Sequence, residues 1–167
     1  MTILVQALVA VMLLLAQMPS GAEWEQIDGK KNPEKVPQWH TWDYVFRVIA
    51  NGPEGKLPTI IQEEATPEDI AVLFKEARAQ EQRRHDVEAK VTALSMRLDK
   101  DKRSVLIAEN DTLVAEFHAE IIAARDRVLG VLSSAARVAA VQYAESTKAS
   151  VHISVPKSQL NAFRQPE

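Results

Sequence analysis

The chain has 167 residues, a formal net charge of −3 at pH 7 and no cysteine. The lack of cysteine excludes disulfide bonds, cysteine-ligated zinc sites and thiol catalysis. Acidic and basic residues are interleaved along the chain, as in the segment from Glu81 to Asp86, and this mixture argues against a nucleic-acid partner.

Residues 1–22 predict a signal peptide, because they contain no charged side chain and one apolar run from Ile3 to Ala16. That run is about 14 residues long, whereas a membrane-spanning helix needs about 20. Small residues at Ser20 and Ala22 fit cleavage after Ala22. We therefore expect an exported protein, either periplasmic or extracellular. The alternative is an uncleaved membrane anchor over residues 1–18, because no lysine or arginine precedes the apolar run.

The next segment, residues 23–37, is polar and carries glycine and proline, so we predict an irregular arm. A short helix is predicted over residues 38–50, where Trp39, Trp42 and Phe46 recur at three- and four-residue steps and share one face. An exposed platform for a sugar or a peptide is the alternative use of these rings. We interpret them as core residues, because large aromatic side chains bury much apolar area when they pack.

A helix start follows at Thr66, which has the side chain of an N-cap and precedes Pro67 and two acidic residues. From there to Pro156 the chain contains no further proline and a single glycine, Gly130, among many good helix formers. The sequence therefore predicts a helical domain over residues 38–148.

Most of this domain is predicted to form two long helices, over residues 67–99 and 104–147, followed by an extended tail over residues 149–167. The residues between the two helices are all polar and predict a turn. The expected fold class is all-α, a long antiparallel helical hairpin similar to a coiled coil, with a short aromatic helix before it. One unbroken helical rod that dimerises is the alternative.

The hairpin has an expected register, in which the numbers of facing residues add up to about 204. Arg84 then lies opposite Glu120, and each is a polar interruption in an apolar stripe. Phe117 belongs to the apolar stripe of the second helix. Asn110 interrupts that stripe at a seam position, which is typical of a residue that fixes the register at some cost in stability.

Two histidines, His85 and His118, lie nearly opposite each other in this register. Together with nearby glutamates they could hold zinc, which accepts histidine and carboxylate ligands. However, neither helix carries the HExxH spacing that places two histidines on one helical face. We therefore interpret both as surface side chains and expect no metal.

The chain carries no GxSxG, P-loop or GxGxxG motif. Its neighbouring carboxylates Glu68 and Asp69 follow the predicted helix start, where acidic residues favourably face the helix dipole. We therefore predict that the protein is not an enzyme and uses no cofactor.

Several short segments carry a family resemblance: Val36-Pro37, Trp42, Phe46-Arg47 and the run from Ala124 to Leu129. With them the chain resembles a loose group of small exported all-helical bacterial proteins of unknown function. The resemblance implies a helical fold and export, and it carries over no functional residue.

These observations favour an exported helical protein of the cell envelope with an interaction or structural role. We expect it to self-associate or to bind another protein through its helical faces, and a holdase-like role is one form of such binding. The alternative is a membrane-anchored coiled-coil stalk, and a metal-binding or hydrolytic module is a third hypothesis. We expect contact with a membrane only if the N-terminal segment is retained.

Overall fold

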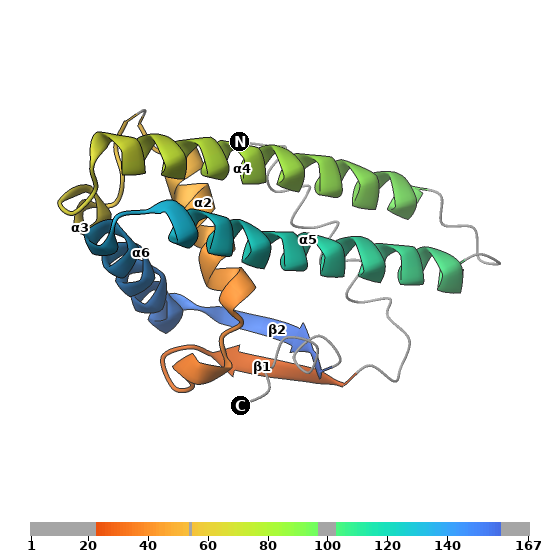
Figure 1. The fold of residues 1–167 in the computed structure, drawn as a ribbon. Helices are drawn as coiled ribbons and strands as arrows, with labels where there is room; N and C mark the ends of the chain where they lie inside the picture. Colours follow the sequence, from red (N-terminus) through yellow and green to blue (C-terminus); the bar gives the residue numbers. More distant parts are fainter. Residues whose placement is uncertain (1–22, 54, 97–102, 158–167) are drawn as a thin grey trace.

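The computed structural model describes residues 23–53, 55–96 and 103–157. The predicted signal peptide and the predicted turn between the long helices lie outside these residues. Most of the described chain is helical, which confirms the prediction of a helical fold (Figure 1). Within the described residues, no helix is both long enough and apolar enough to span a membrane.

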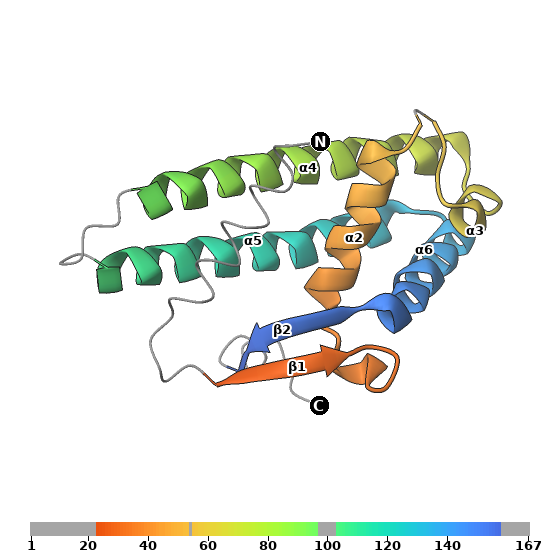
Figure 2. The same ribbon diagram turned by 180° about the vertical axis from the view of Figure 1, so that it is seen from behind.

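Two long helices, α4 (Pro67–Met96) and α5 (Arg103–Val131), run side by side in opposite directions (Figures 1 and 2). Ion pairs between Arg83 and Glu120 (3.0 Å) and between Glu76 and Arg127 (2.8 Å) show which residues face each other. Both pairs have residue numbers that add up to 203. These sums lie close to the predicted value of about 204.

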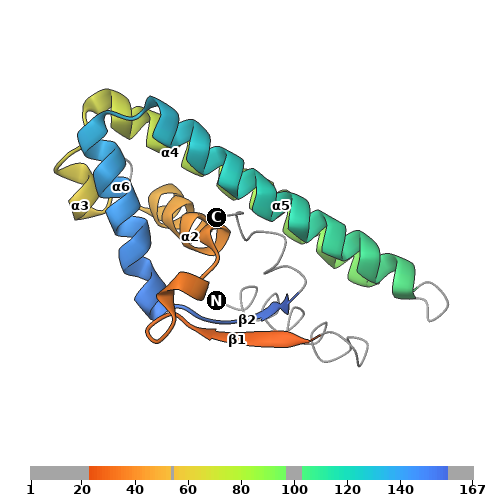
Figure 3. The same ribbon diagram turned by 60° about the horizontal axis from the view of Figure 1, so that its bottom comes forward.

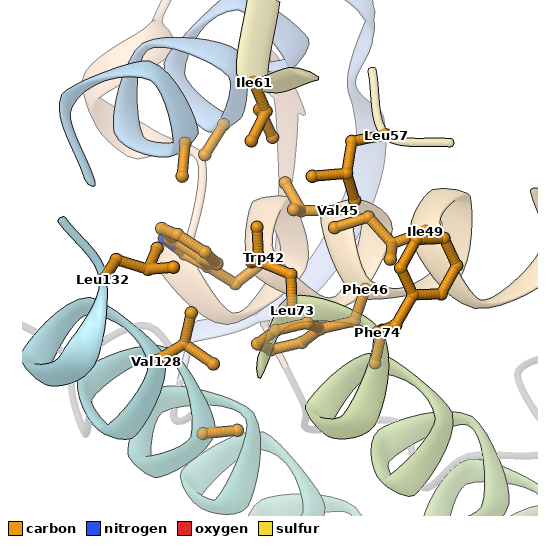
Figure 4. Packing of buried hydrophobic residues seen from close by; sticks show 14 of the residues in the cluster. Trp42, Val45, Phe46, Ile49, Leu57, Ile61, Leu73, Phe74, Val128 and Leu132 are labelled. Atoms are coloured by element: carbon orange, nitrogen blue, oxygen red, sulfur yellow. The ribbon is translucent and has the colours of Figure 1, made fainter. Parts of the chain in front are cut away.

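The helix α2 (Gln38–Asn51) crosses α4 and α5 near one end of the pair (Figure 2). Its buried face contains Trp42, Val45, Phe46 and Ile49, the last three with no exposed surface. These side chains meet apolar residues of α4 and α5 in the main hydrophobic core (Figure 4). The short α3 (Thr59–Gln62) and α6 (Ser134–Thr147) complete this core.

The predicted helix over residues 104–147 is wrong, because α5 ends at Val131 and α6 begins at Ser134. Ser133 forms the N-cap of α6, and its hydroxyl accepts the N–H of Ala136. A serine hydroxyl competes with the helical backbone hydrogen bonds and favours such a break. The break turns α6 away from α5 and toward α2 and α3 (Figure 3).

Two further predictions are wrong, because residues predicted as an irregular segment (23–37) and as an unpaired tail (149–167) form a sheet with each other. The strands β1 (Trp24–Asp28) and β2 (His152–Pro156) pair antiparallel, with Ile27 opposite Ile153. Short 3₁₀ turns, η1 (Pro33–Lys35) and η3 (Lys148–Ser150), flank the sheet. The buried residues Ile27, Val36, Val151 and Val155 form a second small core there.

The long helices extend well beyond the part that α2 covers. The last described buried residue on α4 is Gln80, and the first described on α5 is His118. We call the remainder, residues 88–96 of α4 and 103–116 of α5, the distal arm. The other elements form the base, which lies on one side of the layer made by α4 and α5 (Figure 3).

Candidate functional site

An open groove of about 630 Å³ lies between the two helices of the distal arm. Its apolar lining consists of Ala93, Leu94, Val105, Ala108 and Leu113, and its polar lining consists of Lys90, Glu109, Thr112 and Glu116. The groove has an apolar floor and a charged rim, the usual composition of a protein-binding surface.

The groove exists because small side chains face each other at the distal arm. Ala93 and Ala108 supply little volume, so the half-buried Leu94 and Leu113 do not close the space between the helices. Val105 is 58 % exposed, although it is a β-branched apolar residue. Apolar surface that stays in contact with water is unfavourable, and a continuous patch of it is typical of an interaction site.

The groove opens away from the base. Arg84 of α4 and His118 of α5 both face α2, because they contact Asp43 and Trp39 respectively. Lys90 comes six residues after Arg84, and six steps of about 100° turn a side chain about 120° around the helix. The same rotation separates Thr112 from His118. Both rims of the groove therefore point away from the face that α2 covers.

Alternating charges join α4 and α5 between the groove and the main core. The Arg127 guanidinium lies 2.8 Å from Glu76 and 2.7 Å from Glu120, and the Arg83 guanidinium lies 3.0 Å from Glu120. Burial favours the protonated carboxyls, but hydrogen bonds from Arg127 and Gln80 outweigh it, so the pKa values of Glu76 and Glu120 are lowered. This network links α4 to α5 beside the distal arm.

The predicted contact between Arg84 and Glu120 is wrong. Arg84 instead lies 3.1 Å from Asp43 of α2 and 3.1 Å from Glu81 of its own helix. The next residue around the helix, Arg83, takes the position toward α5. Because successive residues are about 100° apart, the orientation of α4 that directs Arg83 toward α5 directs Arg84 toward α2.

Aromatic stacking joins α2 to α5. The rings of Trp39 and His118 are 3.5 Å apart with planes 8° from parallel, and His118 is 7 % exposed. His40 lies against the edge of Trp39 at 5.4 Å. Burial, together with the charge of nearby His40, lowers the pKa of His118 to about 4, so the imidazole is neutral at pH 7.

The two histidines considered as metal ligands have different surroundings. His118 packs against α2, whereas the His85 side chain is 61 % exposed and lies 3.4 Å from Glu81. In the described ranges, no three histidine or acidic side chains are grouped so that they could hold a metal ion. His118 is therefore a core residue rather than the surface residue that the sequence predicts.

Asp69 links the start of α4, at Thr66, to the start of α6, at Ser133, by hydrogen bonds. The Thr66 hydroxyl accepts the N–H of Asp69 (3.2 Å) and donates to its carboxylate (3.0 Å). The same carboxylate accepts the N–H (2.9 Å) and the hydroxyl (2.7 Å) of Ser133. Burial would raise the pKa of Asp69, but these bonds outweigh it and lower the pKa to about 2. This carboxylate is thus a structural anchor.

The remaining predicted structural residues lie at the core and at its edge. Trp42 is 4 % exposed and Phe46 is fully buried, so these rings form no open platform. Phe117 packs against the edge of the main core. Asn110 is half-buried, and its Oδ1 has no hydrogen-bond partner within the described chain.

Comparisons with protein-family models, with curated proteins and with solved structures found no match for this chain. The candidate site therefore rests on geometry. The sequence analysis missed the groove. Small residues at Ala93 and Ala108 indicate it only when the register of the two helices is known. The sequence analysis also missed the contact between His40 and the Trp39–His118 stack, because no periodicity connects α2 with α5.

Proposed function

We propose that this protein is a non-enzymatic protein-binding module of the cell envelope. In this proposal the base folds as a support and the distal arm presents its groove to a protein partner. The observation that carries the proposal is the groove itself, an apolar channel with a charged rim between the two helices of the distal arm.

A binding role fits the groove better than catalysis does. The described residues that line the groove include no histidine, serine or aspartate, and both glutamates are exposed to water. An apolar floor between exposed charges suits the apolar face of a partner helix.

We also propose that the protein is exported, on the strength of the apolar N-terminal segment. The second candidate is an anchored stalk, in which residues 1–18 stay in the membrane and the arm reaches outward. Intact-mass measurement of the native protein, with fractionation of the cells, tests both. A chain that begins at Glu23 in the soluble fraction supports export, and an uncleaved chain in the membrane fraction supports the stalk.

Site-specific photo-crosslinking tests the binding role. A photoreactive residue replaces Ala108, which lines the groove, and in a matched control it replaces Ala115, an exposed alanine of α5 outside the groove. Both proteins are produced in the host cells, irradiated and analysed by immunoblotting and mass spectrometry.

We expect protein adducts from position 108 and few or none from position 115, because only the former faces the partner. Equal yields at both positions, or no adduct at either, would contradict the proposed function. A holdase would give many different adducts from position 108, whereas a dedicated binding protein would give one or a few.

A further inference from the structure

We propose that the groove of the distal arm binds the same groove of a second copy of this chain. This proposal rests on the protein-binding role above and specifies the partner. The two copies would face each other across a twofold axis that runs along the groove, with their arms pointing in the same direction.

The charges on the rim carry this proposal. Lys90 lies on the α4 side, and Glu109 and Glu116 lie on the α5 side. In the register of the Arg83–Glu120 ion pair, Lys90 is level with position 113. That level falls between the two glutamates, each about one helical turn away. The cation of one rim therefore stands level with a gap between two anions on the other rim.

A twofold axis along the groove lays α4 of each copy over α5 of the other copy without any shift along the helices. Lys90 of each copy then faces Glu109 and Glu116 of the other, and this contact occurs twice because a twofold interface is self-complementary. The other twofold axis, across the groove, would lay α4 on α4 and α5 on α5. It would bring like charges together, which is unfavourable.

The position of the base permits this arrangement. The base lies on one side of the layer of α4 and α5 (Figure 3). The rotation of Lys90 and Thr112 relative to Arg84 and His118, which contact α2, directs the groove to the other side. The two bases would therefore lie on the outer faces of the dimer, and the four arm helices would lie between them. The small side chains Ala93 and Ala108 would let the two layers approach closely, as in helix bundles.

The contact is short, which determines how the dimer must be measured. The lining residues of α5 span about 18 Å of helix, from Val105 to Glu116. Such a contact is smaller than most stable interfaces, which bury about 1,200 Å² or more. We therefore expect a dissociation constant of about micromolar order, and concentrations on both sides of it must be covered.

A charge exchange between two different copies tests the proposal by sedimentation equilibrium of the purified protein. One variant is Lys90→Glu and the other is Glu109→Lys with Glu116→Lys. All three side chains are exposed, so both variants should fold, and circular dichroism checks this. Alone, each variant brings like charges together at the interface, and we expect self-association to weaken about tenfold or more.

Mixing the two variants in equal amounts is the decisive step. In a mixed dimer the introduced glutamate of the first variant faces the two introduced lysines of the second. Lys90 of the second variant faces Glu109 and Glu116 of the first, so we expect association to return to the wild-type strength. If the mixture associates no better than the separate variants, or if the wild type stays monomeric at all concentrations, the proposal is wrong. Photo-adducts from position 108 that contain only other proteins would likewise overturn it while leaving the protein-binding role intact.

Discussion

Asp69 accepts two hydrogen bonds from Ser133, which lies 64 positions later in the chain. Because Asp69 also bonds Thr66, one carboxylate serves the N-termini of both α4 and α6. Anions at helix N-termini are stabilised by unpaired N–H groups and by the helix dipole. This residue therefore ties the start of α6 to the start of α4.

We expect Asp69→Asn to destabilise the fold by about 1–2 kcal/mol and to flatten the acid side of the stability profile. The pKa of Asp69 is about 2 in the folded state against 3.8 without the bonds, so the unfolded state binds more protons in between. The contribution is complete above about pH 4 and is lost as the pH falls toward 2. Urea unfolding at several pH values measures it, and an unchanged profile in the variant would contradict this role.

His118 should make the fold sensitive to mild acid. Its pKa falls from 6.5 to about 4 on folding, mainly through burial, so the unfolded state takes up the proton first. Stability should therefore drop as the pH is lowered from about 6.5 to 4, by up to about 3 kcal/mol. His118→Phe keeps a ring against Trp39 but removes the titration, so the difference between the two pH profiles isolates this residue. A variant that follows the wild-type profile over that range would disprove the assignment.

Two adjacent arginines of α4 should differ sharply when each is replaced by alanine. The Arg84 side chain is 11 % exposed and pairs with Asp43, whose pKa is raised by burial and only partly lowered by Arg84. Its loss leaves a buried carboxylate without its main counter-charge, which costs about 2 kcal/mol or more. The Arg83 side chain is 46 % exposed, and we expect less than about 1 kcal/mol there. Equal losses in denaturant unfolding would show that Arg84 is not the interior partner of α2.

Two glycines should respond in opposite directions to alanine. A Cβ at Gly29 would lie 1.9 Å from the carbonyl oxygen of Lys148, so Gly29→Ala must push β1 away from η3 and lower the melting temperature. A Cβ at Gly130, inside α5, meets nothing within 4 Å. Gly130→Ala should raise the stability by up to about 1 kcal/mol, because alanine favours the helix. Thermal unfolding of both variants checks the pair, and a stabilising Gly29→Ala would contradict the close approach.

The sequence predicts the helical parts of this fold well, because helix formation depends on local residues. The scarcity of glycine and proline after Pro67 indicates long helices, and the spacing of Trp42 and Phe46 indicates a buried face. The break at Ser133 was missed, because its position against the start of α4 depends on Asp69, a residue distant in sequence. The pairing of β1 with β2 was missed for the same reason, because the two strands come from opposite ends of the described chain.

The site was harder to predict than the fold, because it depends on the register of two helices. Arg83, and not its neighbour Arg84, lies at the seam with α5. The groove becomes visible only when Ala93 and Ala108 are known to line the same space. The spacing of apolar residues shows which side of a helix is buried. It does not show how far the helix is rotated about its axis or shifted along its neighbour.

The size of the native complex tests the binding role of the groove most directly. The test variant carries Ala93→Glu with Ala108→Glu, which places two charges in the groove, and the matched control carries Ala89→Glu with Ala115→Glu at exposed positions of the same helices. Native gel filtration of host extracts compares both variants with the size expected of a single chain. We predict that the wild type and the control elute in a larger complex and that the groove variant elutes as a folded monomer. Identical elution of the two variants would contradict the account.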